Sequence, residues 1–176
     1  MSRAADVYTS PSSATKSSIS TVVTSADGDL LTVDLALLTG GVAADSALSF
    51  IVGEPRHADD AAMIATIERA LQAGIDAAGP GVRIGDISFA MGSVLHDAGY
   101  LINTDFGGHG IGSSMHQDPH VSNIGRPGRG YTLRPGLMLA LEPWIMADTD
   151  ELITDADGWT LRSATGCAPH TANTPS

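Results

Sequence analysis

Two aspartates, Asp34 and Asp45, interrupt an otherwise apolar segment and are the first residues whose spacing points to chemistry. They stand on either side of Thr39-Gly40-Gly41, and glycines between two apolar runs predict a hairpin. A turn centred on Thr39 and Gly40 places Asp34 directly opposite Asp45, with Cβ atoms about 5 Å apart. Like charges at such positions repel each other, and a bound cation removes the repulsion. The alternatives are that one aspartate caps a turn, or that the strands pair in another register.

A histidine surrounded by glycines is the next candidate. His109 lies within Gly107–Gly112, and His116 follows seven residues later. Glycine allows close backbone approach, so an imidazole can be held where bulkier neighbours would block it. Glu142 ends an apolar run directly before Pro143, and a carboxylate buried there needs a partner. A histidine in a loop is more often a surface residue, however, and a glutamate before proline can equally mark an exposed strand end.

The elements that must position these residues follow from hydrophobic spacing. Apolar residues at helical spacing predict one helix around residues 63–75 and a second around residues 84–95. The first ends at Gly79-Pro80-Gly81, and Gly99 is the expected C-terminal cap of the second. Short apolar strands separated by glycine loops follow, of which residues 137–141 form the clearest.

The N-terminal region has a different character. Residues 1–18 are rich in serine and threonine and lack periodicity, which predicts a poorly ordered arm. Residues 19–23 predict a short strand. We therefore expect one flexible arm at 1–18 and a single domain at 19–176.

The composition narrows the class of protein further. Together, 43% hydrophobic residues, 20 glycines and 9 prolines predict a turn-rich α+β fold. The net charge of −11 argues against a nucleic-acid partner, because such binding depends on Lys and Arg neutralising phosphates. The single cysteine, Cys167, suits a reducing compartment, and no apolar stretch is long enough for a signal region or a membrane span. We expect a cytoplasmic protein with no membrane partner.

A series of linked motifs runs along most of the chain. In order they are Gly28-Asp29, Val33-Asp34, Asp45-Ser46, Phe50, Gly108-His109-Gly110-Ile111-Gly112, Met115-His116, Asn123 to Gly128, Leu133-Arg134-Pro135-Gly136, Leu141-Glu142-Pro143 and Asp157-Gly158-Trp159-Thr160. In order and spacing these motifs resemble the type I methionine aminopeptidases. The resemblance implies a pita-bread fold, with an antiparallel sheet, helices on one face and an incomplete first half.

The same resemblance implies a metal centre and an activity. One or two divalent ions (Mn, Co, Fe or Zn) would be bound by Asp34, Asp45, His109 and Glu142, with Asp45 bridging. His116 would hydrogen-bond the substrate and the developing oxyanion, and Glu142 would also transfer a proton. The implied reaction removes an N-terminal methionine from a peptide through a metal-bound water.

Three departures from the family pattern affect these expectations. The family's fifth ligand, a glutamate, has Ala172 as its counterpart here. His170 lies two residues earlier, on the same face of an extended strand, so we expect its imidazole to replace part of the missing ligand's role. Lys16 stands in the neighbourhood where the family has another substrate-site histidine. Family members also have a longer N-terminal segment, which predicts an uncovered sheet face or a homodimer in this chain.

The remaining set of Asp45, His109 and Glu142 is enough for one ion, so we predict a mononuclear centre with Asp34 beside it or in a weaker second site. The favoured function is a metalloaminopeptidase acting on peptides. The alternative is a degenerate relative that holds one metal or none and performs other metal chemistry or binds a small molecule or a partner. A third alternative is a truncated remnant that folds poorly.

Overall fold

A computed structural model describes residues 25–158, residues 160–165 and the backbone of residues 170–171. In chain order the elements are β1 (Leu30–Thr39), β2 (Val42–Ile51), α1 (Asp60–Ala77), α2 (Ile84–Asp97), β3 (Leu101–Ile102), β4 (Gly107–Ile111), β5 (Gln117–Ser122), β6 (Met138–Ala140), β7 (Trp144–Met146), β8 (Leu152–Thr154), β9 (Leu161–Ser163) and β10 (His170–Thr171). The expected arm and the expected strand at 19–23 lie outside the described residues.

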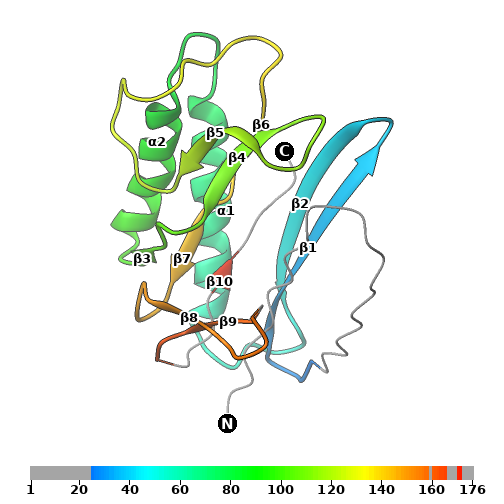
Figure 1. The fold of residues 1–176 in the computed structure, drawn as a ribbon. Helices are drawn as coiled ribbons and strands as arrows, with labels where there is room; N and C mark the ends of the chain where they lie inside the picture. The colour runs from blue at the N-terminus through cyan, green and yellow to red at the C-terminus, as the bar shows by residue number, and fades with distance from the viewer. Residues whose placement is uncertain (1–24, 159, 166–169, 172–176) are drawn as a thin grey trace.

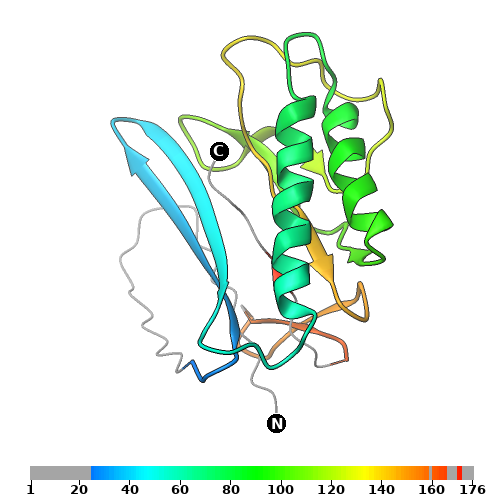
Figure 2. The same ribbon diagram turned by 180° about the vertical axis from the view of Figure 1, so that it is seen from behind.

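The two helices form a layer on one side of strands β4 to β7, and the long β1–β2 hairpin stands alongside these strands (Figures 1 and 2). Every strand pair among the described residues is antiparallel. The predicted α+β class, with an antiparallel sheet and helices on one face, is therefore confirmed. No helix in the described part of the chain is long and apolar enough to cross a membrane.

The hairpin confirms the predicted turn but not the predicted pairing. Gly40 and Gly41 both have positive φ, 58° and 80°, as a tight two-residue turn between twisted strands requires. The turn is therefore centred one residue later than expected, and Asp34 faces Ala47 instead of Asp45. The prediction of a directly opposed aspartate pair was wrong. The two aspartates are diagonal neighbours on one face, because a register shift of two residues preserves the alternation of faces.

Both predicted helices are present, and their buried stripes build the core. One cluster lies between α2, β5 and the segment around β6 and contains Leu71, Ile84, Ile87, Met91, Val121, Leu133 and Leu141. A second contains Met63, Ile67, Ala70, Leu95 and Ile145 and joins both helices to β7. Gly99, with φ of 82°, follows the end of α2, as its role as a cap requires. The predicted strand at 137–141 is present as β6.

Strand β4 runs between β5 and β6 at very close range. A Cβ atom at Gly108 would lie 2.2 Å from the carbonyl oxygen of Ala140, and one at Gly110 would lie 2.2 Å from the carbonyl oxygen of Asp118. Both neighbours are backbone atoms that cannot move aside, so only glycine fits at these positions. The glycines that flank His109 therefore allow β5 and β6 to pack directly against the backbone of β4, which fixes the position of His109.

We predict that Leu95→Ala lowers the free energy of unfolding by about 2–5 kcal/mol, because it removes a fully buried side chain from the core. Phe89→Ala on the same helix is the matched control. Its ring is 49% exposed, so the loss there should stay below about 1 kcal/mol. Urea unfolding followed by circular dichroism measures both values. Equal losses in the two variants would contradict this description of the helix layer.

Candidate metal centre

Three metal-ligating side chains from separate parts of the chain meet beside the hairpin. Asp45 comes from β2, His109 from β4, and Glu142 from the segment between β6 and β7. The Nε2 atom of His109 lies 3.0 Å from Oε1 of Glu142 and 3.6 Å from Oδ2 of Asp45. One ligand atom from each residue lies within 4.8 Å of the other two. Metal–ligand bonds of about 2.1 Å put neighbouring ligand atoms roughly 3.0–3.4 Å apart, so the cluster has dimensions that suit one small divalent ion.

The hydrogen bonding of His109 leaves the correct nitrogen for a metal. Nδ1 lies 2.9 Å from the carbonyl oxygen of Gly110 and donates its proton there, so in the neutral imidazole the lone pair is on Nε2. Nε2 is buried and makes no satisfactory hydrogen bond, although the carboxylates of Glu142 and Asp45 lie 3.0 and 3.6 Å from it. A buried polar atom without a partner destabilises a fold. Coordination of a cation would satisfy it, so the three residues fit a divalent metal.

The electrostatics of the cluster favour a positive charge. Burial disfavours the charged imidazole, but the adjacent carboxylates of Asp45 and Glu142 outweigh it and raise the pKa of His109 to about 10. The neighbouring imidazole of His109 in turn lowers the pKa of Asp45. In the metal-free protein a proton on His109 offsets the charge of the two carboxylates. A bound metal cation would take over this role and displace the proton.

Asp34 lies next to this cluster and is not part of the three-residue group. Desolvation, followed by the charges of Asp45 and Glu142, raises the pKa of its carboxyl group to about 6, although the residue as a whole is solvent-exposed. The repulsion expected between the two aspartates is therefore present, across a diagonal of the hairpin.

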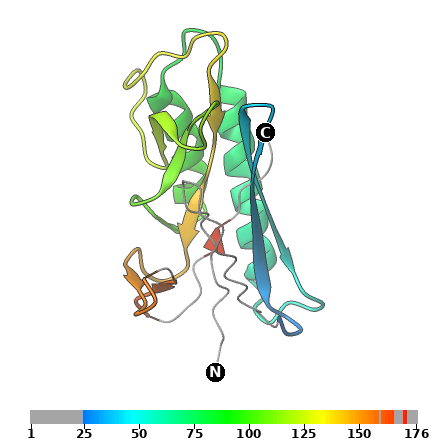
Figure 3. The same ribbon diagram turned by 45° about the vertical axis from the view of Figure 1, so that its right-hand side comes forward.

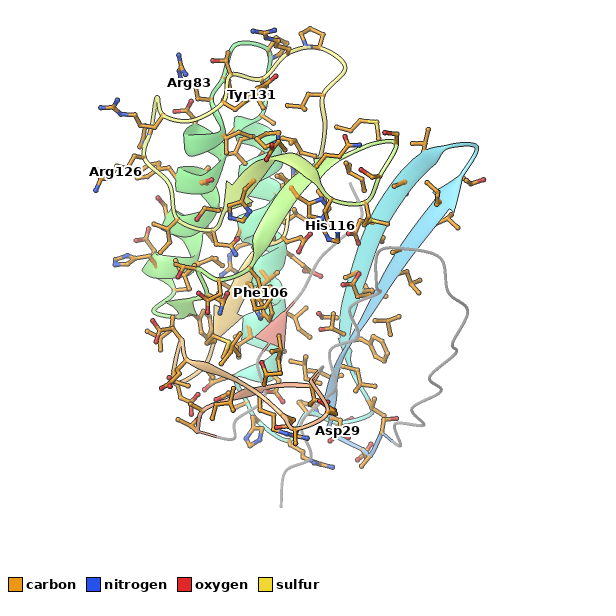
Figure 4. The ribbon with its side chains drawn as sticks, viewed as in Figure 1. Asp29, Arg83, Phe106, His116, Arg126 and Tyr131 are labelled. Carbon is orange, nitrogen blue, oxygen red and sulfur yellow. The ribbon has the colours of Figure 1, made fainter. Side chains whose placement is uncertain are left out.

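His116 is exposed and lies close to the ring of His109. The two ring centroids are 4.4 Å apart, and the rings are tilted by 56°. His116 stands just before β5, and Figure 4 shows it between the end of β4 and the hairpin. The structure thus brings all five predicted site residues to one region. The side chain of His170 and all of Ala172 lie outside the described residues, so the expectation that His170 replaces a fifth ligand stays a prediction.

An aromatic pair at this region was not predicted from the sequence. Leu141 and Ile145 pack into the two core clusters, and Trp144, two residues after Glu142, is also buried. The ring of Trp144 stacks on Phe106 with a centroid separation of 4.5 Å. An aromatic residue two positions after Glu142 was the available signal.

Two buried asparagines hold the loop that carries Phe106. Oδ1 of Asn103 accepts hydrogen bonds from the backbone amides of Asp105 and Phe106, at 3.0 and 2.9 Å. Nδ2 of Asn123 donates to the carbonyl oxygen of Phe106 at 3.3 Å. These contacts form a side-chain-stabilised turn that leads directly into β4. Asn103 followed by a second polar residue and Asp105 is a turn signal that sequence reasoning overlooked.

Comparison with known proteins places the chain among related sequences and folds. The family model of metallopeptidase family M24 matches residues 4–167. The methionine aminopeptidase of Clostridium acetobutylicum is 36% identical over 149 residues, which are 84% of this chain and 59% of that protein. The chain therefore spans about three fifths of the length of this relative.

Solved structures give the same result. The methionine aminopeptidase of Rickettsia prowazekii matches with a TM-score of 0.78 and 30% identity, over 82% of this chain and 58% of that one. The methionine aminopeptidase of Thermotoga maritima matches with a TM-score of 0.77 and 32% identity, over 85% of this chain and 61% of that one.

We predict that Asp45→Asn, His109→Ala and Glu142→Gln each weaken binding of Mn²⁺ at least about 10- to 100-fold, since changes around ligands alone have effects of that size. Asp34→Asn, as the matched control on the same hairpin face, should weaken binding less than any of the three. Isothermal titration calorimetry measures the affinities, with circular dichroism to show that each variant is folded. Equal losses in Asp34→Asn and His109→Ala would instead make Asp34 a ligand of the same ion.

We also predict a pH-dependent effect of Asp34→Asn in the metal-free protein. The pKa of Asp34 is raised from 3.8 to about 6 on folding, so the folded state holds this proton more tightly and loses stability as the pH rises through that range. Asp34→Asn should therefore raise Tm above pH 6 and leave it unchanged below pH 4. Asp150→Asn, an exposed site outside the cluster, is the control. A Tm gain that is equal at both pH values would refute the electrostatic cause.

Proposed function

Because the chain belongs to metallopeptidase family M24, we propose that it is a metal-dependent aminopeptidase that removes methionine from the N-terminus of peptides. The observation that carries the proposal is the convergence of Asp45, Glu142 and the unpartnered Nε2 of His109. We infer the substrate, an N-terminal methionine, from the relatives that are methionine aminopeptidases. We infer the metal-dependent chemistry from the residues of the site.

One divalent ion, Mn, Co, Fe or Zn, would be held by Asp45, His109 and Glu142, a ligand number that leaves positions open for water and substrate. When bound there, such an ion lowers the pKa of its water and polarises a carbonyl group. Asp34 would lie beside Asp45, and a second ion there would bind more weakly than the first.

His116 would act on the substrate and not on the metal. Its ring is exposed and lies beside His109, so its N–H group can reach a carbonyl oxygen held at the centre. Donation of a hydrogen bond to that oxygen stabilises the negative charge that grows on it during attack. The second carboxylate oxygen of Glu142 would accept a proton from the attacking water and donate it to the leaving amine.

The aromatic pair of Phe106 and Trp144 would contact the substrate side chain. Trp144 follows Glu142 by two residues and stacks on Phe106, which directly precedes the strand of His109, so the pair would form an apolar wall beside the candidate centre. Thioether sulfur packs favourably against aromatic rings, so this wall suits methionine. We place the activity in the cytoplasm as part of the same proposal, since a single cysteine suits a reducing compartment.

The decisive experiment uses the purified chain loaded separately with Mn²⁺, Co²⁺, Fe²⁺ and Zn²⁺ and a peptide that begins Met-Ala-Ser. We expect release of free methionine with at least one ion, and none with Glu142→Gln. The same peptide with an acetylated N-terminus is the control, because an aminopeptidase requires the free amine. If the protein binds an ion and cleaves nothing with any of the four, it is the degenerate relative and not a peptidase.

We predict that His116→Ala lowers kcat about 100-fold, the effect of removing one donor to a developing oxyanion, and leaves Mn²⁺ affinity unchanged. His96→Ala on α2 is the matched control, because His96 is exposed and its ion-pair partner is its neighbour Asp97. Steady-state kinetics and calorimetry separate the two roles. A large loss of metal affinity in His116→Ala would make His116 a ligand instead.

A further inference from the structure

A cavity of about 350 Å³ lies between the turn that joins α1 to α2 and the segment that leads into β6. Its lining includes the core side chains of Ile87, Leu133 and Leu141, which are at most 9% exposed. Leu137 and Leu139, which pack on the same core cluster, add to the lining. None of the predicted metal ligands lines it, so this cavity, here called the turn cavity, is separate from the candidate metal centre.

Two tight turns of the same kind form the rim of the turn cavity. In residues 79–82 the amide of the fourth residue donates to the carbonyl oxygen of the first at 3.1 Å, and residues 134–137 repeat this bond at 3.1 Å. Both turns have proline in the second position and glycine in the third, and Gly81 and Gly136 have φ of 86° and 90°. Proline followed by a glycine with positive φ is typical of a type II turn, so both turns are rigid.

The backbone ties the two turns to each other. The amide of Gly81 donates to the carbonyl oxygen of Leu133 at 3.1 Å, and the amide of Leu133 donates to that of Val82 at 2.8 Å. Figures 1 and 3 show the α1–α2 turn and the loop before β6 side by side at one end of the molecule. Every lining residue lies between positions 75 and 141, so the walls of the cavity are built without either end of the sequence. A cavity with such a rim is formed before a ligand arrives, which lowers the cost of binding.

Arg134 is the one charged residue in the lining of the turn cavity. The residue is exposed, and its side chain makes no ion pair with any residue that the structure describes. The two acidic residues nearby in the chain, Asp76 and Asp86, do not line the cavity, and both already accept hydrogen bonds. The guanidinium group of Arg134 is therefore available to an anion from solution.

The surroundings of Arg134 strengthen its attraction for an anion. Residues 119–141 contain three arginines and no aspartate or glutamate, although the chain as a whole has a net charge of −11. Arg83 and Arg126 lie at the same end of the molecule (Figure 4). Positive charge gathered around a concave apolar surface raises the local concentration of anions.

We propose that the turn cavity binds a small amphiphilic anion, with an unbranched apolar chain inside the cavity and a carboxylate on the guanidinium group of Arg134. An apolar lining with one well-placed charged group is the usual composition of a ligand pocket. The planar guanidinium group binds a carboxylate through two parallel hydrogen bonds. At about 30 Å³ for each water-sized group, the cavity holds roughly ten non-hydrogen atoms, the size of octanoate.

The proposed site is independent of the proposed peptidase activity. Its ligand is measured by direct binding to the metal-free protein, and no metal ligand takes part. A chain without peptidase activity can therefore still bind octanoate, and an active peptidase can fail to bind it.

Calorimetric titration of the full metal-free chain with straight-chain carboxylates tests the proposal. We expect octanoate to bind with a Kd of roughly 0.1–1 mM, as the affinity per atom of small ligands implies. From butanoate to octanoate each added methylene should tighten binding about fourfold, which corresponds to about 0.8 kcal/mol of buried apolar surface. Octylammonium has the same chain and the opposite charge, so it should bind at least about tenfold more weakly than octanoate.

Three variants locate the binding site. Arg134→Met should weaken octanoate at least about fivefold and leave 1-octanol unchanged, because it removes only the contact with the carboxylate. Arg129→Met is the matched control, since Arg129 is exposed on the same loop and does not line the cavity, and it should change neither ligand. Ala78→Phe places a ring in the lining and should weaken both ligands at least about tenfold.

Far-UV circular dichroism and a thermal melt establish that each variant is folded. The proposal is overturned if octanoate does not bind the wild-type chain at about 10 mM, well above the expected Kd. It is also overturned if affinity does not depend on chain length, or if Arg129→Met weakens octanoate as much as Arg134→Met does. Sedimentation with and without octanoate completes the test, because an oligomer that octanoate dissociates would assign the cavity to a contact between copies instead.

Discussion

The structure depends on holding two carboxylates, Asp45 and Glu142, against one buried histidine nitrogen. Burial opposes the negative charge of Asp45, and the imidazole of His109 outweighs that effect and lowers the pKa of this carboxyl group. The Nε2 atom of His109 still makes no satisfactory hydrogen bond although Oε1 of Glu142 lies 3.0 Å from it, and a coordinated cation would satisfy it. A centre of this kind is poorly satisfied as a purely structural feature, which is why its arrangement indicates metal chemistry.

Such a cluster requires a rigid support, because a shift of one ångström would separate its ligand atoms. The support comes from the close packing of β4, where Gly108 and Gly110 leave no room for a side chain beside β5 and β6. Behind these strands the helix layer packs Leu141 and Ile145, the residues on either side of Glu142 and Trp144. The core thus anchors the chain immediately before Glu142 and immediately after Trp144. The chain thus combines a packed helix layer with a cluster of metal-ligating residues, and it belongs to a family of metallopeptidases.

The hairpin has two faces with opposite properties. One face carries Asp34 and Asp45 to the centre, and the other is an uncharged apolar surface that no described residue covers. Because side chains alternate along a strand, the alternating sequence of β1 and β2 sets both properties at once. The alternation along this hairpin therefore decides which of its residues can reach the candidate centre.

Local patterns in the sequence determined much of this protein. Both helices, the glycine that ends α2, the hairpin and the residues of the metal cluster follow from periodicity, turn chemistry and recognisable motifs, all of which act over a few residues. The pairing of Asp34 with Ala47 did not follow, since moving the turn by one glycine changes every cross-strand partner while the local pattern stays the same. The stacking of Phe106 on Trp144 and the lone pair left on His109 also came only from the tertiary structure. They arise from contacts between distant segments, and a single sequence contains no local signal for the distance between two such atoms.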